Sequence, residues 1–87
     1  MAESEIIKLR NALGLSQPEF AQLFGVHPMT VSKWERGVLK PTSYQGVMMN
    51  DFEKASREKM VKGTLKNVLI GAGVVAAIYF LLKATRN

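Results

Sequence analysis

Hydrophobic residues recur with the period of an α-helix through the first two thirds of the chain. Ile6, Leu9 and Leu13 are spaced i, i+3, i+7 and Gly14 follows them, so residues 3–13 are predicted to form a helix. Residues 44–59 show the same period and predict a further helix, whose expected apolar side consists of Tyr44, Val47, Met48, Phe52 and Ala55. This period indicates an all-α fold.

Between these two helices, residues 15–37 carry the signals of two short helices joined by a tight turn. Ser16 and Glu19 have the spacing of a capping box, which satisfies backbone amides in the first turn of a helix. Gly25 ends that helix, and Pro28 fits the first turn of the next one. Two short helices joined by a turn that contains glycine form a helix-turn-helix.

The order of residues within this segment is also informative. It reads L-S-Q-x-E-x-A-x-x-x-G-V and continues to W-E-x-G. Over roughly residues 3–60 the chain resembles the lambda-repressor-like (Xre/Cro) family of DNA-binding domains. The resemblance implies a bundle of four or five helices. It also implies a transcriptional regulator of bacterial or phage type that binds double-stranded DNA.

Arg10 shares a helical face with Ile6 and Leu13, so we expect it to be half-buried and to need a partner. The resemblance implies that the partner is Glu35, the acid after the inward-facing Trp34. The spacing alone is equally compatible with an unpaired surface arginine. In either case the role of Arg10 would be structural and not catalytic.

The second helix of such a motif lies in the major groove with its first residues near the base edges. The candidate base-reading residues are therefore His27, Met29, Thr30, Ser32 and Lys33. Lys33 can bond guanine O6 and N7, and Met29 or Thr30 can pack on a thymine methyl group. His27 has two open roles, capping the helix or contacting DNA. The resemblance implies contacts to the DNA backbone from Gln17, Arg36 and Lys40. Ser16 is a further candidate, because the amides at a helix N-terminus favour a phosphate.

The C-terminal part has a different pattern. Residues 67–82 contain no charge and are apolar on every face of a helix, which must then be buried on all sides. Residues 64–83 would span about 30 Å as a helix, which matches the hydrocarbon core of a membrane. A transmembrane anchor, an oligomerisation helix and a tail packed on its own bundle are the three alternatives. Residues that characterise this helix are Val68, Gly73, Ala77 and Tyr79, with Gly73 and Ala77 at small-x-x-x-small spacing.

We therefore expect a helix-turn-helix DNA-binding domain at residues 1–62 and a hydrophobic helix at residues 63–87, a membrane anchor or oligomerisation helix. The first residues hold Glu3 and Glu5 and do not resemble a signal peptide. A tail-anchored chain would lie on the cytoplasmic side of the inner membrane; otherwise the protein would be cytoplasmic. A homodimer or higher oligomer is expected, because helix-turn-helix proteins usually read two half-sites.

Charge and composition change this interpretation in two ways. The net charge of the 87 residues is +5, but residues 1–60 carry eight basic and seven acidic residues, whereas residues 61–87 carry four basic residues and no acid. The basicity therefore belongs mostly to the tail and does not count as evidence for DNA binding. The alternative function is a membrane-associated structural or adaptor protein, whose bundle holds DNA non-specifically or binds protein.

The chain has no cysteine and one histidine, and it has neither paired carboxylates in an apolar setting nor a phosphate-binding loop. We therefore expect no enzyme, and thus no catalytic residue, no metal site and no cofactor.

Overall fold

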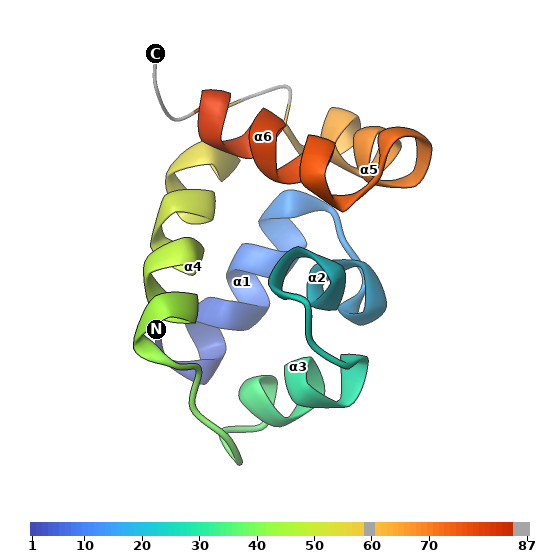
Figure 1. Ribbon diagram of the computed structural model, residues 1–87. Coiled ribbons are helices and arrows are strands. Elements are labelled where there is room, and N and C mark those ends of the chain that lie inside the picture. Colours follow the sequence, from blue (N-terminus) through green and yellow to red (C-terminus); the bar gives the residue numbers. More distant parts are fainter. Residues whose placement is uncertain (59–60, 85–87) are drawn as a thin grey trace.

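The computed structural model describes residues 1–58 and 61–84, which contain six α-helices and no strand. The helices are α1 (Glu3–Leu13), α2 (Gln17–Phe24), α3 (Pro28–Glu35), α4 (Ser43–Ser56), α5 (Val61–Ala72) and α6 (Val74–Ala84). Figure 1 shows α1 and α2 in the middle, α4 along one side, α3 at one end, and α5 and α6 at the opposite end. The all-α prediction is confirmed.

The capping and turn residues predicted from the sequence set the ends of α2 and the start of α3. The Ser16 hydroxyl accepts a hydrogen bond from the amide of Glu19, and the Glu19 carboxylate accepts one from the amide of Ser16 at 2.8 Å, which completes the capping box. Gly25 ends α2 with φ +64°, a conformation that favours glycine, and Pro28 begins α3. The helix-turn-helix therefore follows from interactions within a few residues.

One hydrophobic core joins all six helices. The ring of Phe24 lies 5.0 Å from that of Phe20 and 5.6 Å from those of Trp34 and Phe52, measured between centroids, so it links α2, α3 and α4. The buried residues are Ile6, Leu9, Leu13, Leu15, Phe20, Ala21, Leu23, Val31, Trp34, Met49, Phe52, Ala55, Val61, Leu65, Leu69, Ala77 and Leu81.

The predicted apolar side of residues 44–59 is partly wrong. Phe52 and Ala55 are buried, but Met49 and not Met48 completes the buried face, while Tyr44 and Val47 are exposed. Because Met48 and Met49 are adjacent and equally apolar, the sequence does not show which of them faces the core. Packing of the helix against α1 decides it. Helix α4 ends at Ser56, and the predicted end at residue 59 lies outside the described residues.

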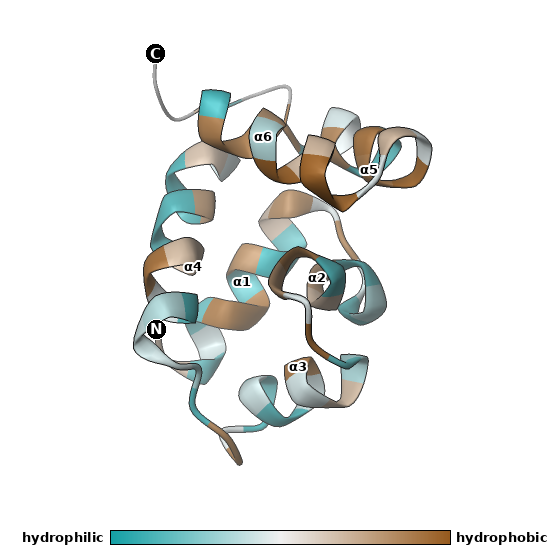
Figure 2. Cartoon of the chain, in the orientation of Figure 1, coloured by the Kyte–Doolittle hydropathy of each residue, from teal (hydrophilic) through white to brown (hydrophobic). Residues whose placement is uncertain are grey.

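The single hydrophobic helix predicted for residues 63–87 is wrong over residues 63–84, and residues 85–87 lie outside the described part of the chain. Gly73, with φ +95°, separates α5 from α6, which fold back on each other. Figure 2 shows that hydrophobic residues are densest along α6. Within residues 1–58 and 61–84, no helix has the length and apolar character needed to cross a membrane.

The tail instead packs on its own bundle, the third of the alternatives above. Leu65 and Leu69 of α5 and Ala77 and Leu81 of α6 are buried in the shared core. Helix α5 packs on α1, and α6 packs on α2 and α4. Since α5 begins at Val61, it continues across residues 62–63, where we expected a domain boundary.

The characteristic tail residues serve different purposes in this arrangement. Val68 is half-buried, Gly73 forms the turn, Ala77 is buried against the bundle and Tyr79 is exposed. The small-x-x-x-small pair therefore does not form one exposed helix-pairing face.

Candidate nucleic-acid interface

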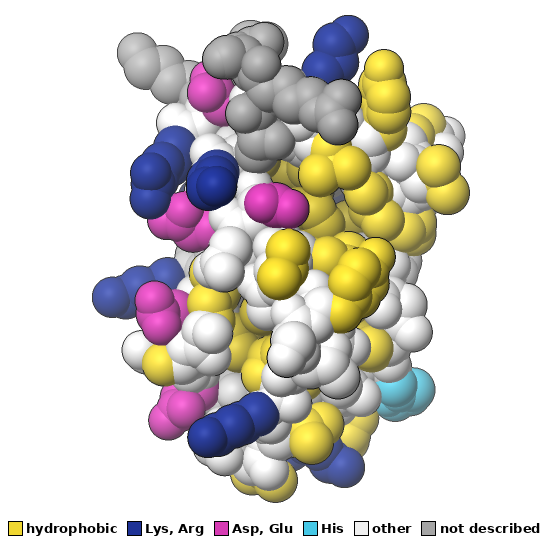
Figure 3. All heavy atoms as spheres, turned by 60° about the vertical axis from the view of Figure 1, so that its left-hand side comes forward, with side chains coloured by type: hydrophobic (Ala, Val, Ile, Leu, Met, Phe, Trp, Pro, Cys, Tyr) yellow, Lys and Arg dark blue, Asp and Glu magenta, His cyan; other side chains and the backbone are white. Residues whose placement is uncertain are grey.

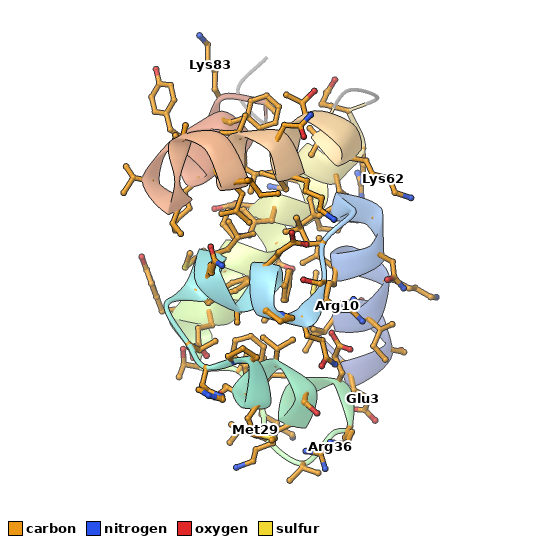
Figure 4. All side chains as sticks on the ribbon, turned by 90° about the vertical axis from the view of Figure 1, so that its right-hand side faces the viewer. Glu3, Arg10, Met29, Arg36, Lys62 and Lys83 are labelled. Carbon is orange, nitrogen blue, oxygen red and sulfur yellow. The ribbon has the colours of Figure 1, made fainter. Side chains whose placement is uncertain are left out.

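Helix α3 is held by one face and exposes the other. Val31 and Trp34 are buried in the core. Met29, Lys33 and Arg36, spaced i, i+4, i+7, are exposed. Figure 4 shows Met29 and Arg36 at the end of the molecule that α3 forms, far from Lys62 and Lys83. The start and the outer face of α3 are thus accessible to a large partner.

His27 caps the N-terminus of α3. Its Nδ1 accepts a hydrogen bond from the amide of Met29 at 3.0 Å, so the capping role is confirmed. A neutral imidazole that accepts through Nδ1 carries its proton on Nε2. The exposed His27 therefore has a donor left for another partner. Thr30, one turn further, is half-buried.

Two predicted contact residues bind each other. Arg36 Nε donates to the Ser32 hydroxyl at 3.2 Å and to the Ser32 carbonyl at 3.3 Å. These bonds use one of the three guanidinium nitrogens, and the two terminal nitrogens can still hold an anion. Lys40 is exposed in the loop between α3 and α4. Arg36 and Lys40 therefore lie close to α3 along the chain.

An ion pair fixes α1 to the end of α3. Arg10 Nε lies 2.6 Å from one carboxylate oxygen of Glu35, and a terminal Arg10 nitrogen lies 3.1 Å from the other. Only 18% of the Arg10 side chain and 7% of the Glu35 side chain are exposed. The predicted pair is confirmed. Arg10 also donates to the carbonyl of Leu15, so it holds the start of the motif as well.

Gln17 joins this pair, which the sequence did not indicate because the two residues are 18 positions apart. Its amide nitrogen donates to Glu35 at 3.1 Å. Burial acting alone would raise the pKa of Glu35, but the hydrogen bonds from Arg10 and Gln17 and the charge of Arg10 outweigh it and hold the pKa below its ordinary value. Glu35 is thus ionised and paired at neutral pH. Gln17 keeps one of its two amide hydrogens for a further acceptor.

The structure therefore gathers most of the predicted contact residues around α3. His27, Met29, Thr30, Ser32 and Lys33 belong to the helix or its cap, and Arg36 and Lys40 follow it. The bond to Glu35 brings Gln17, and with it the adjacent Ser16 at the start of α2, beside the end of α3. Within the described ranges, no cluster of three or more histidine, aspartate or glutamate residues could hold a metal ion.

Comparison with known families agrees with this geometry. A family model described as Helix-turn-helix matches residues 6–43, which comprise most of α1, all of α2 and α3, and the first residue of α4. The match covers less than half of the chain and supports a DNA-binding function of the transcription-regulator type. Neither curated proteins nor solved structures provide a match. Helices α5 and α6 lie outside the matched segment.

Proposed function

We propose that this protein binds DNA sequence-specifically as a transcriptional regulator of Xre/Cro type. The observation that carries the proposal is the anchoring of α3 by Val31 and Trp34, which leaves Met29, Lys33 and Arg36 outward at one end of the molecule. A helix held rigidly by one face can enter a major groove with the other.

Base reading would begin at the N-terminus of α3. Lys33 is proposed to donate to guanine O6 and N7, and Met29 or Thr30 to pack on a thymine methyl group. His27 and Ser32 are at the margins of this contact, since each is already engaged in a hydrogen bond.

Backbone contacts would fix the orientation of the domain. The amides at the N-terminus of α2 favour an anion, and Ser16 and Gln17 lie at that terminus. Arg36 and Lys40 would hold phosphates on the other side of the motif. The pairing of Glu35 with Arg10 supports this assignment, because it removes an unpaired negative charge from the proposed DNA face.

A homodimer is part of the proposal, because two copies that read half-sites about 34 Å apart gain affinity over one. Because this function requires the protein to reach DNA, the proposal includes a cytoplasmic location. A transmembrane tail is not part of the proposal, since Leu65, Leu69, Ala77 and Leu81 are used in the core.

The test begins with selection of binding sites from a random DNA pool, followed by footprinting of the preferred site. Lys33→Ala and Lys40→Ala form a matched pair of exposed substitutions. Lys33→Ala should weaken the preferred site by about 1–3 kcal/mol while leaving random DNA unchanged, which relaxes base preference. Lys40→Ala should weaken all DNA equally and lower the salt slope by about one. An equal loss on preferred and random DNA for Lys33→Ala would refute its base-reading role.

A structural or adaptor role is the second candidate. It is favoured by the nearly balanced charge of residues 1–60, since proteins that clamp DNA non-specifically are usually more basic. The same selection separates the two, because an adaptor would enrich no sequence and give no footprint.

A further inference from the structure

The two ends of the molecule differ in chemistry. Helices α5 and α6 expose four large hydrophobic residues, which we call the tail surface: Ile70, Val75, Tyr79 and Leu82. Figure 3 shows hydrophobic side chains gathered over the end of the molecule that these helices form. The exposed fractions are 70% for Ile70, 83% for Val75 and 67% for Tyr79. The proposed DNA contacts do not use this surface.

Three of the four residues of the tail surface lie on α6. Val75, Tyr79 and Leu82 are spaced i, i+4, i+7 and form one stripe, while Ala77 and Leu81 on the opposite side are buried. Helix α6 is therefore attached to the bundle by one apolar face and presents a second apolar face outward.

Positive charge accompanies this stripe. Residues 61–87 contain basic residues and no acid. Lys83 follows Leu82 directly, and Figure 4 shows Lys83 pointing away from the body of the molecule, whereas Lys62 lies against the end of α1, beside Gly14. Lys66 is half-exposed and its ammonium lies 3.8 Å from the carboxylate of Glu19, so that cation is partly compensated. An apolar stripe that ends at an exposed lysine, on two helices without an acidic residue, complements the headgroups and acyl boundary of an anionic bilayer.

We infer that the tail surface docks on the surface of an anionic membrane, with α5 and α6 kept folded on the bundle. Val75 and Tyr79 enter the interface, and Lys83 binds the anionic headgroups. This is a peripheral contact and not a span, because the inner faces of both helices remain in the core. Docking leaves α3 at the opposite end of the molecule free, but the preference for a membrane over a second copy rests in part on the proposed DNA binding.

A second copy of the chain fits this surface less well. Pairing through a two-fold axis would bring together two tails that contain basic residues and no acid, so the tails would supply no ion pair across the interface. It would also place the two α3 helices at opposite ends of the assembly, since α3 lies at the end away from α6. Two such helices could not read neighbouring half-sites of one duplex.

The placement of α3 and α6 has a functional consequence. A chain docked through its tail surface still presents Met29 and Arg36 on the far side from the membrane. If α3 binds DNA as proposed above, the docked protein would hold that DNA close to a membrane without crossing it.

The test is co-sedimentation of the full chain with vesicles of phosphatidylcholine alone or mixed with phosphatidylglycerol. Binding should require phosphatidylglycerol and should weaken as salt is added. The variant Val75→Ser/Tyr79→Ser should lose at least tenfold in vesicle affinity. The matched control is Tyr44→Ser/Val47→Ser, which changes similarly exposed residues (74% and 59%) on α4 and should leave vesicle affinity unchanged.

A charge variant tests Lys83 separately. Lys83→Gln should weaken binding to the mixed vesicles about fivefold, whereas Lys54→Gln, an exposed lysine on α4, should have little effect. Equal binding to both vesicle types, or no binding to either, would overturn the inference.

Two further readouts keep the result interpretable. Circular dichroism checks that the exposed substitutions leave the fold intact. Gel shifts on a selected DNA site should be unchanged in Val75→Ser/Tyr79→Ser, so membrane docking and DNA binding can fail independently. If this variant instead turned a dimer into a monomer by sedimentation without changing vesicle affinity, the occupant would be a second copy and the inference would be wrong.

Discussion

Leu65→Ala tests most directly whether the tail is part of the folded domain. Leu65 is fully buried in α5, in contact with the core that α1 contributes. Trp34, the only tryptophan, is buried in α3 at the other end of that core. A change in the tail can therefore be followed by a fluorophore that lies within the helix-turn-helix.

The expected loss of folding stability in Leu65→Ala is large. Truncating a fully buried leucine to alanine costs about 3 kcal/mol and up to about 5 where the cavity does not collapse. Domains are typically stable by roughly 5–15 kcal/mol, so this loss is a considerable part of the total. In a domain of this size it lowers the Tm by roughly 12 °C or more.

The measurement is urea unfolding followed by Trp34 fluorescence and by circular dichroism. Ile70→Ala, on the same helix but largely exposed, is the matched control and should change stability by no more than about 0.5 kcal/mol. If Leu65→Ala left the Trp34 transition unchanged, the tail would not share one cooperative core with the helix-turn-helix, and the reasoning would be refuted.

Further predictions concern the contacts that fix the bundle. Arg10→Met or Glu35→Leu alone should lower the free energy of unfolding in urea by about 3 kcal/mol, because each leaves a half-buried charge without its partner. The double variant should recover most of this loss, and additive losses would contradict a coupled pair. The pKa of Glu35 is lowered in the folded protein, so the stability that this residue contributes is complete at neutral pH and is lost as the pH falls below the ordinary value of 4.5. In a plot of unfolding free energy against pH, Glu35→Gln should therefore reduce the decline below that pH. An unchanged decline would exclude Glu35 as its source. Gly14→Ala should lower the free energy of unfolding more than Gly25→Ala does. Both glycines have positive φ, but only at Gly14 would the new Cβ lie 2.9 Å from Lys62. Equal losses of stability in the two variants would show that α5 does not pack against Gly14.

Some features of this fold could be predicted because they depend on neighbours in sequence. The capping box of Ser16 and Glu19, the left-handed Gly25 and the cap at His27 are satisfied within three residues or fewer. The Arg10–Glu35 pair was predictable through the resemblance, since the spacing alone allowed an unpaired arginine. Most candidate contact residues could be chosen because they lie on or beside one short helix.

Other features had no local signal. The choice between Met48 and Met49 depends on the surface that α1 offers to α4. The bond from Gln17 to Glu35 joins residues far apart in the chain, so it forms only when α2 and α3 are packed together.

The tail shows most clearly how far the structure can be predicted from sequence alone. By itself the sequence indicated that residues 67–82 seek apolar surroundings, because they contain no charge and almost no polar group. The stronger expectation of burial on every face was wrong, since Ile70, Val75 and Tyr79 are exposed. The sequence could not determine what covers the buried faces, since lipid, a second copy and the chain's own bundle are equally apolar surroundings. The tertiary structure decided this: Gly73 turns the chain, and α1, α2 and α4 supply the surface that buries Leu65, Leu69 and Leu81. Capping depends on residues that are adjacent in sequence, whereas burial depends on surfaces that exist only after distant helices have packed.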